Sequence, residues 1–471
     1  MLNQTLQEKY PHLEISVLKL SEVQKDNESK RIDSEFFKKE YFDAMETMQL
    51  NQVEYLGDNM KFNSRYSQPK YDETSKIKVI NSQYIRNEYI DYENAKSGYG
   101  KIVPKESVLI NATGVGTLGR VFINILDFDF SIDSHINVIV VKNKTYLNPY
   151  FLAIFLQSYY GQIQIIRYYS GTSGQIEIYP RDFNYFKIPI FPMEFQLEIQ
   201  NLVKDSHKAL EESKELYKKA EETLYLELGL DPKNPLQSLL DSKTNNPTNS
   251  PNISIHTLKE SFLKTGRLDS EYYQSKYEDI EKFIKSYPNG YDSFSSIINN
   301  KDTNFTPKNN ENYSYIELAN IGNNGNISEP ISDLGKNLPT RARRIVSKGD
   351  VIISSIEGSL SSCALITQEF DKHLVSTGFF VLNSKLLNGE TLLVMFKSQI
   401  FQEYLKKFPS GTILCAINKE ELSKILIPKI DSTTQEKIAK YIQESFNLRK
   451  KSKQLLDNAK IKVEEQIQGK I

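Results

Sequence analysis

The stretch RIDSEFFKKEY (Arg31–Tyr41) recurs in the second half of the chain as RLDSEYYQSKY (Arg267–Tyr277). Most positions are identical or chemically similar, and the charged and aromatic residues keep their order. A repeat that is about half a chain long indicates two copies of one structural module. The sequence therefore predicts a duplicated protein.

Other segments repeat in the same order. IVPKESVLINATG from Ile102 is matched by IVSKGDVIISSIEG from Ile345, and both are typical of a turn followed by a buried strand. LNPYFLAIFLQS from Leu147 is matched by LNGETLLVMFKS from Leu387, and both predict an apolar helix with an asparagine cap. We therefore expect one mixed, strand-rich domain to occur twice.

Each copy continues through a small polar loop into a long helix. The loops are YYSGTSG from Tyr168 and FPSGTIL from Phe408. The helices that follow show the a/d spacing of a coiled coil, with serine at the third and fifth seam positions. An amphipathic helix packed on its own domain would also fit this spacing, but the shared serines favour a pair in which the two helices meet. The expected seam comprises Ile199, Leu202, Ala209, Leu216, Ile438, Tyr441, Leu448 and Leu455.

The predicted fold class is α+β, with two tandem strand-rich domains that are each followed by a long helix. The two helices are expected to pair as an antiparallel coiled coil with pseudo-twofold symmetry. The expected boundaries are a first domain at 1–192, a first helix at 193–230, a Pro-, Asn- and Ser-rich linker at 231–252, a second domain at 253–430 and a second helix at 431–471.

Composition narrows the function classes. In 471 residues, 59 Lys and Arg nearly balance 60 Asp and Glu, so nucleic-acid binding would need local basic patches. The two cysteines and five histidines show no metal-ligand spacing, which predicts no metal site. Neither a signal peptide nor a long apolar stretch is evident, and we expect a cytoplasmic protein without a membrane span.

The segment ATGVGTLGR (112–120) contains a G-x-G-x-x-G pattern, which could cradle the phosphates of a dinucleotide. Because strand-forming residues follow it and the second copy keeps only Gly358, a tight turn between strands is the better interpretation. LNPYF at 147–151 partly matches an amino-methyltransferase signature, but a helix cap explains it. His135 has no paired nucleophile, so we predict no catalytic residue.

Polar loops that differ between the copies are candidates for contact with DNA. Arg31 and Arg267 could each pair with the nearby aspartate or contact a phosphate, and the sequence leaves both possibilities open. In the first copy the candidates are Asn111, Thr113, Thr117, Arg120, Arg167, Tyr168, Ser170 and Thr172. In the second copy they are Arg341, Arg343, Arg344, Ser354, Ser355, Glu357, Ser359, Ser410 and Thr412.

The duplicated R-[IL]-D-S-E-aromatic-aromatic opening, the SGT loop and the Ile-Pro segment before a glutamine (Gln196, Gln435) resemble the specificity subunits of type I restriction-modification systems. The resemblance implies two target recognition domains that each read one half of a bipartite double-stranded DNA site, with the helices as a spacer. The helix entries PIFPMEFQ and PKIDSTTQ depart from the usual family pattern, which leaves the packing against a partner open.

The resemblance also implies a non-catalytic chain that binds two modification (methyltransferase) subunits and, in the full enzyme, restriction subunits. It implies no cofactor in this chain, because S-adenosylmethionine belongs to the modification subunit. The alternative function is a duplicated coiled-coil scaffold that does not read DNA. Salt-dependent DNA binding distinguishes the two hypotheses.

Overall fold

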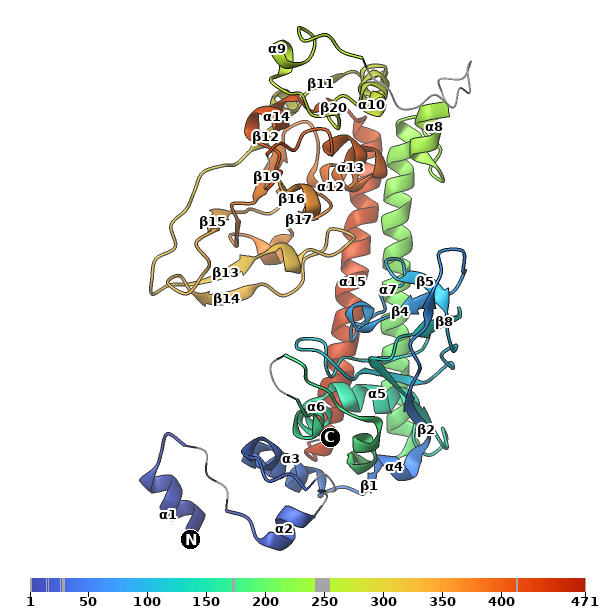
Figure 1. Cartoon of the computed structure of the whole chain (residues 1–471), viewed down its shortest axis with the longest axis vertical. Helices are drawn as coiled ribbons and strands as arrows, with labels where there is room; N and C mark the ends of the chain where they lie inside the picture. The colour runs from blue at the N-terminus through green and yellow to red at the C-terminus, as the bar shows by residue number, and fades with distance from the viewer. Residues whose placement is uncertain are drawn as a thin grey trace. The chain divides into compact units, whose positions relative to one another are not determined.

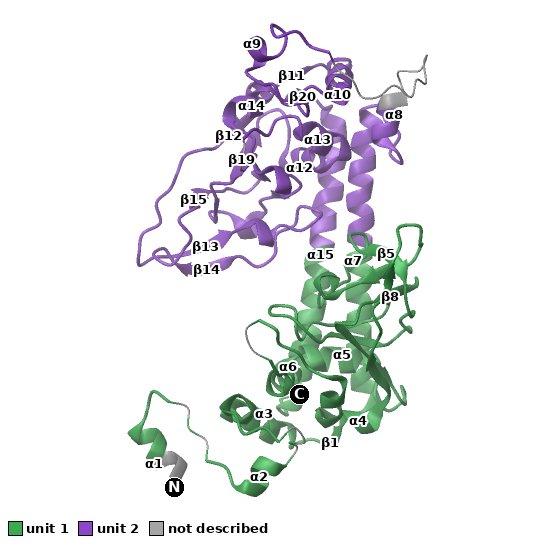
Figure 2. Cartoon of the chain, viewed as in Figure 1, with its two compact units in different colours: residues 1–211, 449–471 green, residues 212–448 purple. Residues whose placement is uncertain are grey.

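The computed structural model of the chain describes residues 2–13, 15, 17–25, 27, 30–171, 174–241, 255–411 and 414–470. Half of the expected linker, residues 242–252, lies outside these ranges. The chain forms two compact units, coloured separately in Figure 2. Unit 1 comprises Met1–Glu211 and Arg449–Ile471, and unit 2 comprises Glu212–Leu448, so each unit contains a part of both long helices. The predicted domain boundaries, which assign each helix to one copy, stay a prediction.

Unit 1 combines short strands with helices, labelled in Figure 1. Its strands are β1 (Val53–Tyr55), β2 (Met60–Arg65), β3 (Lys70–Tyr71), β4 (Lys78–Ile80), β5 (Lys96–Tyr99), β6 (Val108–Asn111), β7 (Val121–Ile123), β8 (Phe130–Ile132), β9 (Ile136–Val141) and β10 (Lys187–Pro189). Its helices before the long ones are α1 (Leu2–Lys9), α2 (Leu20–Gln24), α3 (Lys39–Met48), α4 (Leu56–Asn59), α5 (Pro149–Gln157) and α6 (Tyr159–Tyr168).

Unit 2 follows the same plan. Its strands are β11 (Tyr291–Ser293), β12 (Ile298–Asn300), β13 (Asn312–Ile316), β14 (Ile331–Leu334), β15 (Ala342–Ile345), β16 (Val351–Ser354), β17 (Cys363–Leu365), β18 (Leu374–Ser376), β19 (Phe379–Ser384) and β20 (Leu426–Pro428). Its shorter helices are α8 (Pro235–Asp241), α9 (Phe262–Thr265), α10 (Ser275–Lys285), α11 (Phe294–Ile297), α12 (Gly389–Lys397), α13 (Gln399–Leu405) and α14 (Lys419–Lys424).

The main sheets of the two units have matching strand orders, whereas their second sheets, β3-β5-β4-β8 and β14-β13-β18-β15, match only in part. The antiparallel sheet β2-β9-β6-β7 of unit 1 corresponds to β12-β19-β16-β17 of unit 2. A second sheet in each unit contains one parallel pair, β4 with β8 and β13 with β18. A third, two-stranded sheet joins β1 to β10 and β11 to β20. The structure thus confirms the two strand-rich domains predicted from the repeat.

The apolar helices α5 and α12 begin at the predicted asparagine caps. The side chain of Asn148 accepts a hydrogen bond from the Tyr150 amide, and that of Asn388 accepts one from Thr391. The amide of each cap residue donates to a buried glutamine side chain, at 2.7 Å for Gln196 and 2.9 Å for Gln435. These glutamines therefore fix the start of each long helix against its domain.

The long helices are α7 (Met193–Glu227) and α15 (Ser432–Ile467). At a rise of about 1.5 Å per residue, each is about 50 Å long. Of the expected seam, Ile199, Ile438 and Ala209 are buried, whereas Leu202, Leu216, Tyr441, Leu448 and Leu455 are half-buried. At four of those half-buried positions the next residue along the chain is the buried one, namely Val203, Tyr217, Ile442 and Leu456.

Within each unit the two helices meet through a pair of buried serines. In unit 1, the hydroxyl of Ser206 lies 2.9 Å from both the carbonyl and the hydroxyl oxygen of Ser452. In unit 2, the hydroxyl of Ser445 lies 2.7 Å from the Ser213 carbonyl and 3.1 Å from its hydroxyl. The partner number falls on α15 as it rises on α7, so the helices run antiparallel, as predicted.

Candidate nucleic-acid interface

In unit 1, backbone hydrogen bonds join two loops that are far apart in sequence into one layer of chain. The glycine turn (residues 112–120) links β6 to β7, which confirms a turn between strands and leaves no helix to receive a pyrophosphate. Its Gly114, Gly116 and Gly119 all have positive φ, which glycine adopts at little cost. Gly114 donates to Ile176 of the second loop, whose described residues are 170–171 and 174–178, and Ile178 donates back to Ala112.

The turn between β8 and β9 completes this layer. The amide of Ala112 donates to the carbonyl of His135 at 2.9 Å, and the Thr113 hydroxyl lies 3.0 Å from Nδ1 of His135. No sequence pattern places His135 beside Thr113, because 22 residues separate them. The exposed His135 therefore joins Thr113 as a polar group on the rim of the layer.

Two arginines that sequence reasoning missed flank the second loop. Arg65, at the end of β2, donates to the Glu177 carboxylate and to the Ile178 carbonyl. Its guanidinium also lies 5.7 Å from the ring of Tyr179, and that of the exposed Arg181 lies 5.2 Å from the same ring. Neither arginine belongs to a repeated motif, so no sequence signal marked them.

The predicted residues of unit 1 separate into two groups. Thr113, Thr117, Arg120 and Ser170 are half-exposed on the loops. Thr117 donates to the Thr113 carbonyl, and Arg120 donates to the Gly116 carbonyl at 2.7 Å, so both brace the glycine turn. Burial and the nearby Arg86 lower the pKa of Arg120. Thr172 lies outside the described residues.

Three other predicted residues lie beneath the loops and not on their surface. Asn111 is fully buried and donates to the Ser82 carbonyl at 2.7 Å. Arg167 is buried with its guanidinium 3.7 Å from the Tyr41 ring and 4.2 Å from the Phe36 ring, and Tyr168 is buried beside it. These three side chains, at most 7% exposed, therefore belong to the support of the loops and not to their surface.

Unit 2 repeats the arrangement with different residues. The loop after β16 (residues 355–362) is joined to the second loop, whose described residues are 410–411 and 414–417. Ile356 bridges to Ala416, and the carbonyl of Ser355 accepts from Ile417 at 2.8 Å. Ser410 bridges to Ala416 as well. Glu357 is exposed, Ser355, Ser359 and Ser410 are half-exposed, and Ser354 is buried with its hydroxyl 2.7 Å from that of Ser359. Thr412 lies outside the described residues.

The basic residues 341–344 lie next to this layer. The carbonyl of Arg341 accepts from Thr377, whose neighbour Gly378 accepts from Ser355, so β15 borders the loops. Arg341 is exposed and Arg343 is half-exposed, with its Nε donating to the Thr340 carbonyl. Arg344 donates to the Phe379 carbonyl, and burial lowers its pKa. Arg341 is thus the member most available to a phosphate.

The R-[IL]-D-S motifs form the same contact in both units, which we call the arginine clamp. In unit 1, Arg31 makes two hydrogen bonds of 2.7 Å to Asp33 and two more to the carbonyls of Arg167 and Tyr169. The carboxylate of Asp33 also accepts from the Phe36 amide at 3.1 Å. The hydrogen bond from Arg31 lowers the pKa of Asp33.

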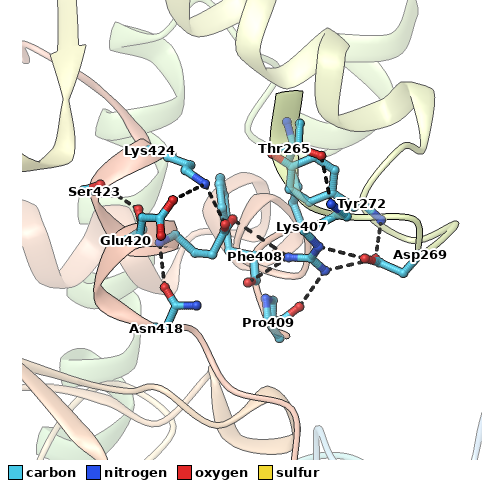
Figure 3. Close-up of polar contacts among 12 residues, drawn as sticks. Thr265, Asp269, Tyr272, Lys407, Phe408, Pro409, Asn418, Glu420, Ser423 and Lys424 are labelled. Atoms are coloured by element: carbon cyan, nitrogen blue, oxygen red, sulfur yellow. Dashed lines mark hydrogen bonds and ion pairs between the residues drawn. The ribbon is translucent and has the colours of Figure 1, made fainter. Parts of the chain in front are cut away.

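The clamp of unit 2 is shown in Figure 3, where Asp269, Phe408 and Pro409 surround one guanidinium. Arg267 donates to Asp269 at 2.7 and 2.9 Å and to the carbonyls of Phe408 and Pro409 at 3.2 and 2.7 Å. An oxygen of the buried Glu421 carboxylate lies 3.9 Å from Nη1 of Arg267. Of the two roles left open for Arg31 and Arg267, the structure thus shows the internal one.

The described residues contain no group of three or more His, Cys, Asp or Glu side chains that could hold a metal ion. Among the same residues, no helix is both long and apolar enough to span a membrane.

Residues 43–222 match the sequence profile of the family described as type I restriction modification DNA specificity domain. Over 129 residues the chain is 29% identical to the type I restriction enzyme HindI specificity subunit of Haemophilus influenzae. That match spans 26% of this chain and 28% of the relative.

Solved structures of low sequence identity also align over most of the chain. The S subunit of a type I restriction-modification system from M. genitalium is 13% identical, with coverage of 88% of this chain and 95% of that one and a TM-score of 0.41. The HsdS subunit from Thermoanaerobacter tengcongensis is 14% identical, with coverage of 89% and 97% and a TM-score of 0.27.

Proposed function

We propose that the chain is the DNA sequence-specificity subunit of a type I restriction-modification complex, in which each domain reads one half of a bipartite site. The observation that carries the proposal is the repeated pair of joined loops, one pair in each unit, in a chain whose residues 43–222 match the specificity-domain family. The loops are joined by corresponding backbone bridges but carry different side chains, as expected for two domains that read different bases.

The side chains on the loop rims suit this role. Thr113 and His135 in unit 1 and Ser355 and Ser410 in unit 2 can donate to and accept from base edges. The exposed Arg181 and Arg341 can bind phosphates, which fix the position of a protein on DNA without reading sequence. The chain supplies recognition, and the proposed methyltransferase partners bind S-adenosylmethionine and carry out the chemistry.

The test uses the full chain assembled with its methyltransferase subunits. We expect methylation at a split, asymmetric DNA sequence, and DNA binding that weakens as salt rises. Arg181→Gln and Arg341→Gln should each weaken binding to all sequences alike. Each should also make the plot of log affinity against log salt less steep, by about 0.9. A complex that binds DNA without any salt dependence would favour the scaffold alternative.

A further inference from the structure

The arginine clamp holds the backbone immediately before the loops that are proposed to read DNA. Tyr169 and Pro409, whose carbonyls accept from the clamp arginines, directly precede Ser170 and Ser410. Those two serines form the bridges that close the second loop of each unit, to Glu177 and Ala416. The clamp therefore contacts the backbone at the base of the second loop in each unit.

The clamp is anchored in the domain core. Asp33, which accepts two hydrogen bonds from Arg31, also caps the turn at Phe36. The Phe36 ring is fully buried and lies 5.1 Å from the Arg31 guanidinium. In unit 2, Asp269 caps the turn at Tyr272, whose ring lies 4.5 Å from the Arg267 guanidinium. A planar guanidinium can bind both oxygens of a carboxylate through two nitrogens and still donate to carbonyls. The single ammonium nitrogen of lysine lacks this fork.

The two copies differ in the loop and agree in the clamp. YYSGTSGQIEI and FPSGTILCAIN share the Ser-Gly-Thr core and little else, while the arginine and the aspartate are the same in both. A constant support beneath a variable surface is what loop positioning requires, because recognition groups need rigid holding to discriminate between bases.

We propose that Arg31 and Arg267 are positioning residues that set the base discrimination of the half-site read by their own unit. This inference rests on the proposed function. Each arginine acts through the loop backbone and does not touch DNA, so its loss relaxes the reading of one half-site and leaves the other unchanged.

The experiment measures methylation by the full chain in complex with its methyltransferase subunits. The substrates are the cognate site and variants with one base changed in either half, and the readout is the ratio of cognate to variant rates. We expect Arg31→Gln to lower this ratio about tenfold in one half only, the factor that corresponds to one hydrogen bond to a charged group. Arg267→Gln should do the same in the other half.

Two further variants address folding and charge. Arg31→Lys keeps the charge but loses the fork, and its ratio should lie nearer that of Arg31→Gln than that of the wild type. As controls, Lys105→Gln in unit 1 and Lys308→Gln in unit 2 each remove an exposed lysine from a surface ion pair. Neither change should alter base discrimination in either half-site. Unchanged discrimination in the second half-site shows that a variant complex is folded.

Three results would overturn the inference. Full discrimination by Arg31→Gln and Arg267→Gln would show that the clamp does not position the loops. An equal loss in both half-sites would show that the arginines only support overall folding. A wild-type complex that methylates no bipartite site would refute the proposed function itself, and this outcome is recognised before any variant is compared.

Discussion

The serine pairs between α7 and α15 make a quantitative prediction about the helix seam. All four serines are buried, yet the two members of each pair are not equivalent. Ser206 donates to the Ser452 carbonyl and also contacts its hydroxyl, whereas Ser452 contacts only the Ser206 hydroxyl among the hydrogen bonds of this pair. In unit 2, Ser445 plays the part of Ser206, and Ser213 plays that of Ser452.

The magnitude follows from the number of hydrogen bonds that each substitution removes. Ser206→Ala removes two buried contacts and should lower the free energy of unfolding by about 2 kcal/mol, at about 1 kcal/mol per hydrogen bond. Ser452→Ala removes one and should cost about 1 kcal/mol. The double variant should cost about as much as Ser206→Ala alone, which is a coupling of about 1 kcal/mol.

The assay is urea unfolding of the full chain followed by far-UV circular dichroism, because the chain contains no tryptophan to serve as a fluorescent probe. Ser445→Ala and Ser213→Ala repeat the comparison in unit 2. Ser286→Ala, an exposed serine at the end of α10, is the control and should change stability by less than about 0.5 kcal/mol. Equal costs for Ser206→Ala and Ser452→Ala, or additive costs in the double variant, would refute the described seam.

Three other predictions concern single residues. Cys363 is fully buried and burial raises its pKa to about 12, so a thiol reagent at neutral pH should modify only the half-exposed Cys415 in the folded chain and both cysteines in denaturant. Gly171→Ala should disturb the loop and reduce methylation that depends on unit 1, because φ is +111° there and a Cβ atom would lie 2.0 Å from the Gln175 carbonyl oxygen; normal activity of this variant would contradict the loop geometry. Burial raises the pKa of Asp133 above its usual 3.8, so ionisation costs the folded state stability as pH rises through the folded pKa. Asp133→Asn should therefore raise the melting temperature at neutral pH, by an amount that shrinks as pH falls through the folded pKa and vanishes below 3.8, and a gain that is constant with pH would exclude this cause.

The fold was predictable because the two halves of the chain can be compared with each other. Repeated strands, capped helices and serines at matching positions specified two strand-rich domains and an antiparallel helix pair. The serines meet at the predicted seam positions, but the sequence did not indicate which apolar residue beside them is the more buried, because such residues are adjacent, as in Leu202-Val203 and Leu455-Leu456. Spacing cannot decide which neighbour faces the partner helix and which faces the domain.

The loops of the candidate interface were predictable, but the exposure of their side chains was not. Asn111 and Arg167 stand in polar segments and are nevertheless buried, because one bonds a backbone carbonyl and the other fills an aromatic cage. Arg65 and His135 reach the interface through strand pairing, which brings distant parts of the chain together. Sequence spacing carries no information about such contacts.

The most direct test of the proposed function is a methylation map of cells that express the methyltransferase subunits with and without this chain. We expect a split, asymmetric methylated sequence that appears only with the chain, and in which exchange of residues 1–192 for another first domain alters one half alone. Methylation that is unchanged by the chain, or an exchange that alters both halves, would contradict it.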